Sequence, residues 1–175
     1  MIEAARQAYP SGAWEVADAA RWSAPEPCDL IFANALLQWI PDHQRICTRL
    51  MGQVAPGGAL AVQLPAEAHY QSPVHREIRN VSREPAWRGR LEAARAMFTH
   101  APAAFYYDAL QPLASSMNLW ETTYYHVVAG PEALLDWYRG TGLRPFLEAL
   151  AGEEERRNFE RMLFPFTRLF FVAYR

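Results

Sequence analysis

The stretch DLIFAN (residues 29–34) decides the fold, because a short apolar run between an acid and an amide is typical of a buried parallel strand. Residues 43–54 follow with apolar side chains at every fourth position, which predicts an amphipathic helix. APGG (residues 55–58) then suits a type II turn, and LAVQL (residues 60–64) predicts a second buried strand that Pro65 stops. Strand, helix, glycine turn and strand make a right-handed crossover, so the predicted fold class is α/β with an open, mostly parallel sheet.

Weaker patterns on both sides of this unit extend the α/β prediction along the chain. Residues 2–9 have the composition of the tail of a helix, and Trp14-Glu15-Val16 alternates like a short strand. Residues 66–113 turn polar and helical, which predicts a helical cap insertion within one domain of residues 1–175. The other predicted elements are helices at 74–81, 89–98, 131–139 and 153–162 and strands at 120–128 and 168–174.

The composition favours a protein that binds a small molecule. With 51% apolar residues among 175, the chain can bury one sizeable core, and its net charge of −2 gives no electrostatic footprint for nucleic acid or an anionic membrane. The apolar runs 30–40 and 163–174 are shorter than the roughly 20 residues of a membrane span, and no export signal follows Met1. Cys28 and Cys47 lack the spacing of a zinc site or a disulfide framework, so we expect no metal, reduced thiols and a cytoplasmic location.

Four segments together resemble one family of known proteins. They are WEVADA (14–19), DLIFANALLQWIPDH (29–43), LMGQVAPGGALAVQLP (50–65), and TTYYHVV with LLDWYRGTGLRPFLEAL (122–128 and 134–150). The first three resemble many S-adenosylmethionine (SAM)-dependent methyltransferases, and the fourth resembles the trans-aconitate 2-methyltransferase branch in particular. The resemblance implies a Rossmann-like class I methyltransferase fold with helices on both faces of the sheet, and SAM as the cofactor. It also implies methyl transfer to a carboxylate of a small organic acid such as trans-aconitate.

The sequence departs from the family at its start. The family begins with a strand, a Gly-x-Gly-x-Gly turn and a second strand whose last acid binds the ribose, whereas this sequence contains neither motif. In the family sheet order 3-2-1-4-5-7-6, those strands lie between the segments that correspond to Trp14 and Leu30. We therefore expect a partial fold with an exposed sheet edge, which favours self-association. Two alternatives stay open: a non-catalytic fragment that self-associates or needs a separate N-terminal piece, and a methyltransferase for another small-molecule acceptor.

Methyl transfer to a carboxylate depends on positioning more than on proton transfer, because the nucleophile is already ionised at neutral pH. No catalytic acid or base is therefore predicted. By resemblance, Asp18 matches the acid that accepts from the adenine amino group of the cofactor, with Ala19 beside it; the alternative is an aspartate that caps a turn. Asn34 and Ala35 are also cofactor candidates, because they end the first buried strand where open α/β sheets bind ligands, or they satisfy their own loop.

Four residues in two segments are candidates for binding the substrate. By resemblance, Trp39 donates its indole N–H to the carboxylate, with Gln38 beside it; either side chain also suits a core. Tyr124 and His126 project from the same face of the predicted strand, where they can donate hydrogen bonds to an acid. Tyr125 projects from the other face and should pack.

Arg144 is the fifth substrate candidate. It follows a glycine-containing loop and can grip a polycarboxylate with two parallel hydrogen bonds, or it can be solvated. His75, Tyr106 and Tyr107 are weaker candidates, for which we expect a place on the surface or in the packing of the cap.

Overall fold

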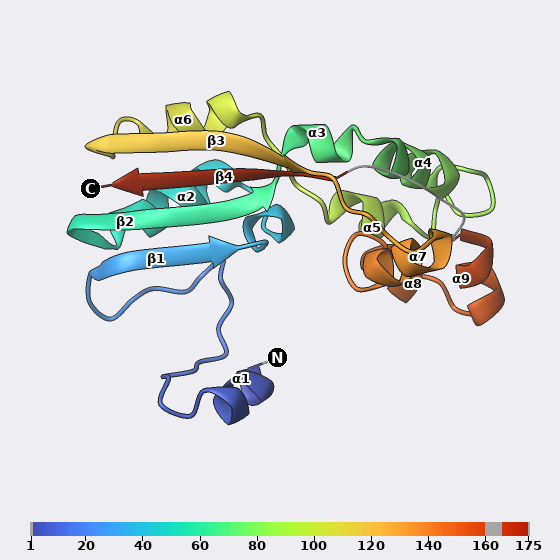
Figure 1. The fold of residues 1–175 in the computed structure, drawn as a ribbon, viewed down its shortest axis with the longest axis horizontal. Helices are drawn as coiled ribbons and strands as arrows, with labels where there is room; N and C mark the ends of the chain where they lie inside the picture. The colour runs from blue at the N-terminus through green and yellow to red at the C-terminus, as the bar shows by residue number, and fades with distance from the viewer. Residues whose placement is uncertain (1, 160–165, 175) are drawn as a thin grey trace.

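The computed structural model of the protein describes residues 2–159 and 166–174, and a four-stranded sheet forms its centre (Figure 1). The strand order is β1 (Cys28–Asn34), β2 (Val54–Pro65), β4 (Phe166–Tyr174) and β3 (Ser116–Tyr124). β1 pairs with β2 in parallel, while β4 is antiparallel to both β2 and β3. The predicted α/β class and the predicted parallel pairing of the two buried runs are therefore confirmed.

The crossover between β1 and β2 follows from the local sequence. α2 (His43–Gly52) begins after Asp42, whose carboxylate accepts a hydrogen bond from the backbone N–H of Arg45 at 3.0 Å. Gly57 has φ 81°, the left-handed conformation that a type II turn requires at this position. Gly58 passes so close to β1 that an added Cβ would lie 2.6 Å from the carbonyl oxygen of Asp29. The two glycines thus allow β2 to return tightly against β1.

Helices cover one face of the sheet and leave the other largely open (Figure 1). α2 and α6 (Ala103–Leu110) pack on the covered face, and the 3-10 helix η1 (Leu37–Trp39) closes the end of β1. On the open face, Phe32 and Trp120 are 67% and 46% exposed, and the Trp120 ring stacks on Phe170 with centroids 5.7 Å apart. Buried side chains of the covered face include Ile31, Leu60, Val62, Leu64, Tyr106 and Phe171.

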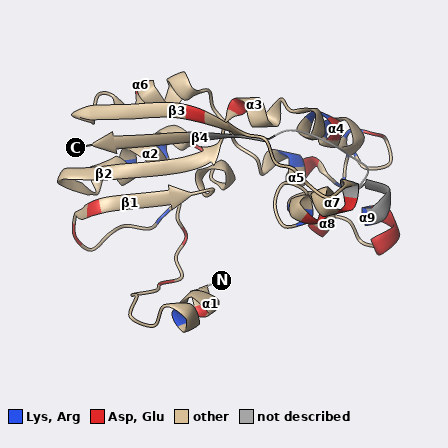
Figure 2. Ribbon diagram, in the orientation of Figure 1, with Lys and Arg blue, Asp and Glu red and all other residues tan. Residues whose placement is uncertain are grey.

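A second, smaller core lies among helices at the carboxyl ends of β1 and β2 (Figure 1). The helices of this region are α3 (Glu67–Tyr70), α4 (Pro73–Ser82), α5 (Glu92–Ala96), α7 (Pro131–Arg139), α8 (Arg144–Glu148) and α9 (Glu153–Phe159). Its buried side chains are Val74, Ile78, Leu91, Ala94, Tyr138, Leu143, Phe146 and Leu150. Charged side chains of both signs are interspersed on these helices, whereas the strands carry few (Figure 2). The cap boundary at 66–113 stays a prediction; within the described chain, α6 packs on the sheet while α7 and α8 share the core of α4 and α5.

Two predicted strands differ from the structure. The segment 14–16 forms no strand but an exposed loop, because no described strand lies beside it and an extended segment needs a neighbour to hydrogen-bond. β3 spans Ser116–Tyr124 instead of 120–128, because its pairing with β4 runs from Ser116 opposite Tyr174 to Tyr124 opposite Phe166. Residues 125–128 therefore leave the sheet, and Val127 is fully exposed.

The helix predictions are mostly confirmed. The predicted helices at 2–9, 43–54, 74–81 and 131–139 correspond to α1 (Ile2–Ala8), α2, α4 and α7. The helix predicted at 89–98 is shorter, because only Glu92–Ala96 is helical. The helix predicted at 153–162 is described as far as Phe159, and its predicted end lies outside the described residues. No helix among the described residues is both long enough and apolar enough to cross a membrane.

Candidate functional site

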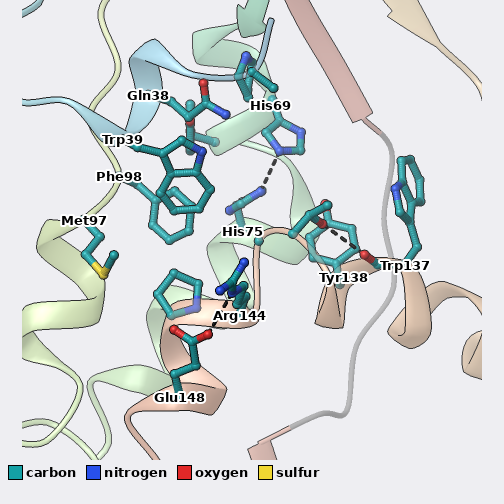
Figure 3. A pocket seen from close by; sticks show the side chains of 17 residues that line it. Gln38, Trp39, His69, His75, Met97, Phe98, Trp137, Tyr138, Arg144 and Glu148 are labelled. Atoms are coloured by element: carbon teal, nitrogen blue, oxygen red, sulfur yellow. Dashed lines mark hydrogen bonds and ion pairs between the residues drawn. The ribbon is translucent and has the colours of Figure 1, made fainter. Parts of the chain in front are cut away.

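A cavity of about 410 Å³ opens where the carboxyl ends of β1 and β2 meet the helical region (Figure 3). Carboxyl ends of parallel strands are where open α/β sheets bind ligands, because the chain diverges there into loops. The segments that follow β1 and β2 supply one wall, and α7, α8 and the loop between them supply the other. The lining residues on which the site depends are Ala35, Trp39, His69, Tyr138, Arg144 and Glu148.

Ala35 turns the chain sharply from β1 into the cavity. Its φ of 50° is left-handed, which costs about 1 kcal/mol or more for a residue with a Cβ. Its backbone N–H donates to the carbonyl of Gln63 at 2.8 Å, so β2 holds this conformation in place. Strained backbone of this kind clusters at functional sites, and here it directs η1, with Gln38 and Trp39, towards the cavity.

Trp39 and Gln38 provide polar groups on the sheet side of the cavity. Trp39 is 37% exposed, and its ring packs against Phe98 with centroids 4.9 Å apart. Figure 3 shows its indole nitrogen on the side of the ring that faces His69 and His75. Gln38 is only 5% exposed, and its Oε1 has no hydrogen-bond partner among the described residues. An indole donor and a buried amide therefore border the same space.

Arg144 lies at the rim of the cavity on α8 (Figure 3). Its Nε donates to Glu148 Oε1 at 2.7 Å, one turn further along the helix. The hydrogen bond and charge of that carboxylate raise the pKa of the guanidinium, which keeps it positive. The structure thus brings Gln38, Trp39 and Arg144 to one cavity, with Glu148 as a competitor for the arginine that sequence reasoning overlooked.

A pair of histidines forms the inner end of the cavity. His69 Nε2 and His75 Nε2 lie 2.7 Å apart, and the two residues are 5% and 6% exposed. Burial, with the charges of Arg79 and His100, lowers the pKa of His75 to about 4, so its ring is neutral at pH 7. A Cβ on Gly142 would lie 3.1 Å from the Tyr138 ring and 3.4 Å from His75 Cε1, so a larger residue here would crowd the Tyr138 ring.

Sequence reasoning overlooked His69 and ranked His75 as a weaker candidate, expected on the surface or in the packing of the cap. His69 follows Pro65 at the carboxyl end of the second buried strand, the position that singled out Asn34 and Ala35 after the first. The same rule applied to β2 would have found it. Of the other weak candidates, Tyr106 is fully buried in the core under the sheet and Tyr107 is 49% exposed.

Tyr124 and His126 lie beside a different hollow, on the open face of the sheet. Their ring centroids are 6.0 Å apart, and both line a hollow of about 500 Å³ that Asn34 also lines. The His126 ring meets Trp137 edge-on at 4.7 Å, and Trp137 also lines the first cavity. Tyr125 is 85% exposed, so the expectation that it packs was wrong, because the strand has ended before it.

Asp18 and Ala19 lie next to a third hollow, along the outer edge of β1. Asp18 accepts a hydrogen bond from the Ala20 N–H at 2.9 Å, which is the turn-capping arrangement weighed above. Ala19 lines a groove of about 320 Å³ with Leu30 and Phe32 of β1. Arg49 of α2 donates to the Ala19 carbonyl at 2.7 Å and holds the segment there. The roles of these residues towards a cofactor stay predictions.

Comparison with known proteins identifies the family. No protein-family model matches the chain. The chain is 44% identical over 191 residues to the trans-aconitate 2-methyltransferase of Azoarcus sp. (strain BH72), covering 100% of this chain and 74% of that relative. It is 41% identical over 192 residues to the trans-aconitate 2-methyltransferase of Methylobacterium nodulans, with the same coverage of each. The chain belongs to the trans-aconitate 2-methyltransferase family.

Solved structures agree with this family at the level of the fold. The chain superposes on a putative methyltransferase from Bacillus halodurans with a TM-score of 0.54 at 10% identity, over 99% of this chain and 78% of that one. It superposes on an S-adenosylmethionine-dependent methyltransferase from Mesorhizobium loti with a TM-score of 0.54 at 14% identity, over 100% and 76% of the two chains. The chain spans about three quarters of the trans-aconitate 2-methyltransferases that it matches. The expected class I methyltransferase fold and the expected family are confirmed.

Proposed function

We propose that this protein transfers a methyl group from SAM to a carboxylate of a small organic acid such as trans-aconitate. The observation that carries the proposal is the 410 Å³ cavity at the carboxyl ends of β1 and β2, bordered by the Trp39 indole and the positive Arg144. Donors and positive charge complement an anionic acid. The names of the relatives support trans-aconitate as the substrate to test first.

The groove beside β1 fits the adenine end of the cofactor. Its walls are the apolar side chains of Leu30, Phe32 and Trp22, which suit the faces of a purine ring. Asp18 stands between two lining residues, and its exposed carboxylate can accept from an exocyclic amino group. Asn34 and Ala35, at the end of β1, line the hollow on the open face, and Ala35 also lines the cavity. These residues would hold the adenine end, whereas the sequence has no Gly-x-Gly-x-Gly turn for the rest of the molecule.

The side chains of the cavity would bind and orient the acid. The cofactor, when bound, supplies a methyl group that a carboxylate can attack without help from a base. Arg144 would hold a carboxylate by charge, and the Trp39 N–H would fix its direction through one hydrogen bond. Orientation of this kind lowers a barrier by several kcal/mol. The apolar rings of Phe98 and Tyr138 would keep water away from the attacking oxygen.

Calorimetry and product analysis test the proposal. SAM should bind with measurable heat, and incubation with trans-aconitate should give the methyl ester by mass spectrometry. Trp39→Phe removes the donor but keeps a ring, so KM for the acid should rise about tenfold. Trp14→Phe is the matched control, because Trp14 also donates one indole hydrogen bond, to the Tyr9 carbonyl, but lies in the N-terminal loop away from the cavity. Absence of SAM binding together with absence of product would overturn the proposal.

A second candidate function is self-association through the unpaired edge of β1. Leu30 and Phe32 are 60% and 67% exposed there, and exposed apolar side chains beside a strand edge favour association. Light scattering on the purified chain tests this second candidate: a stable monomer that melts cooperatively speaks against self-association. A cytoplasmic location, suggested by the two unpaired cysteines, belongs to the proposal as well.

A further inference from the structure

The two histidines at the inner end of the cavity share one hydrogen bond. His69 lies on α3 and His75 on α4, and their Nε2 atoms are 2.7 Å apart. Any hydrogen bond between these two nitrogens needs one protonated and one bare Nε2, so one of the two atoms carries hydrogen and the other accepts. The position of that proton decides what the second nitrogen of His75 offers to a ligand.

The second nitrogen of His75 faces the cavity. Figure 3 shows it turned away from His69, on the side of Trp39 and Phe98. If His69 donates, His75 must carry its own hydrogen on Nδ1 and present a donor. If His75 donates instead, its Nδ1 is a bare acceptor.

The surroundings favour the arrangement with a donor in the cavity. Arg144 brings positive charge to the rim, and the Trp39 indole is a donor, so a ligand that fits them offers acceptor oxygens. A bare nitrogen at the inner end would repel the same oxygens. Burial keeps the His75 ring uncharged at neutral pH, so His75 adds direction without a second full charge.

We propose that His69 is a positioning residue that donates its Nε2–H to His75 and so fixes His75 as the Nδ1–H tautomer, which donates to a carboxylate oxygen of the substrate. Arg144 at the rim and His75 at the inner end then form two separate donor positions. Such an arrangement selects an acid with more than one carboxylate over a monocarboxylic acid. The inference rests on the proposed function, because it concerns the acid that the same cavity would take.

Histidine-selective ¹⁵N NMR tests the tautomers without cofactor or substrate. In protein labelled at histidine, with resonances assigned by the single variants, His75 Nδ1 and His69 Nε2 should be protonated and His75 Nε2 bare. The opposite pattern, with hydrogen on His75 Nε2, would overturn the inference while leaving the proposed function standing.

Titration with trans-aconitate tests the donor. The His75 Nδ1 resonance should move on binding, and His75→Phe should weaken binding about ten- to hundredfold, the value of a hydrogen bond to a charged group. His43→Gln is the matched control: His43 is also buried and bonded, to the Tyr106 hydroxyl at 2.6 Å, but does not line the cavity. Binding that leaves the His75 signals unmoved would reject the role of His75.

Two substitutions of His69 separate positioning from simple packing. His69→Gln keeps an N–H donor and should retain most of the affinity, whereas His69→Leu keeps bulk but no donor and should lose it about tenfold. Equal losses in both variants would mean that His69 only packs. If the wild-type chain binds no carboxylic acid at all, the proposed function fails and the substrate contact inferred here fails with it, whatever the tautomers.

Discussion

On one face of the sheet, α2 and α6 bury Leu60 and Phe171 completely, whereas on the other face Leu30 and Phe32 leave 60% and 67% of their surface exposed. All four are large apolar side chains on strands of the same sheet. In β1 the alternation is direct, because Ile31 is 8% exposed while the residues on both sides of it face solvent. A continuous apolar run predicts a strand covered on both faces, and the described structure covers one. The apolar side chains of a strand therefore show where the fold gains stability only when the layer that packs on them is known.

Truncating one leucine on each face of the sheet should give the largest difference in the loss of unfolding free energy. Leu60→Ala should lower the free energy of unfolding by about 3 to 4 kcal/mol, because it leaves a cavity in a packed core. Leu30→Ala removes the same atoms from the open face and should cost less than about 1 kcal/mol. Urea unfolding of both variants checks this. Equal losses would contradict the comparison and would mean that the open face is covered in solution.

Acid should weaken the packed regions, since the histidines with lowered pKa values lie in them. His75 titrates at 6.5 when unfolded but near pH 4 when folded, so the unfolded chain binds the proton first as pH falls. The neutral His75 ring contributes about 3 kcal/mol to the free energy of unfolding above pH 6.5. This contribution is lost as the pH falls from 6.5 to 4. His43, whose pKa is also lowered by burial, acts in the same direction.

The measurement is the free energy of unfolding of wild type and His75→Gln at a series of pH values between 7 and 4. The variant should show the flatter dependence. Parallel curves would mean that His75 takes up a proton in the folded protein as readily as in the unfolded chain.

Removing one tyrosine hydroxyl from each face of the sheet should give a smaller difference in stability loss. Tyr106→Phe removes the partner of His43 Nδ1, at 2.6 Å, and leaves that buried nitrogen unsatisfied, so it should cost about 1 to 2 kcal/mol. Tyr124→Phe, at a side chain that is 41% exposed, should change stability by less than about 0.5 kcal/mol. Thermal melts of the two variants, matched to wild type, test this. A larger loss from Tyr124→Phe would show a contact on the open face that the folded monomer lacks.

The sequence predicts the fold best where local chemistry sets an element. Asp42 caps the start of α2, the glycines at 57–58 let β2 return against β1, and the predicted helix at 131–139 is matched because Pro131 begins it and Gly140 ends it. The strands that were misplaced depend on partners. Segment 14–16 has strand-like residues but no strand beside it in the part of the chain that the structure describes, and β3 starts at Ser116 because β4 extends far enough to pair with it. Pairing of this kind is a property of the whole sheet and cannot be seen in one segment.

The same distinction applies to the site. Ala35 borders the cavity, as its position after the first buried strand suggested, because the carboxyl end of a parallel strand has a fixed place in the fold. Trp39, a candidate by resemblance, and Arg144, a candidate after a glycine-containing loop, border the same cavity. The contact between His69 and His75 was not predictable, because it depends on the angle at which α4 leaves α3. The salt bridge from Arg144 to Glu148 was visible as an i,i+4 spacing and was overlooked.

The last difference between the faces concerns association rather than stability. Phe32→Ser should leave the free energy of unfolding nearly unchanged, because Phe32 is 67% exposed and few contacts are lost. If the open face associates, the same change should lower the mean mass seen by light scattering at high protein concentration, since it removes apolar area beside an unpaired edge. Val16→Ser, in a loop at 77% exposure, is the matched control and should not alter the mass. A wild-type chain that stays monomeric, with a Phe32→Ser variant of identical mass, would show that an open apolar face alone does not drive this family member to assemble.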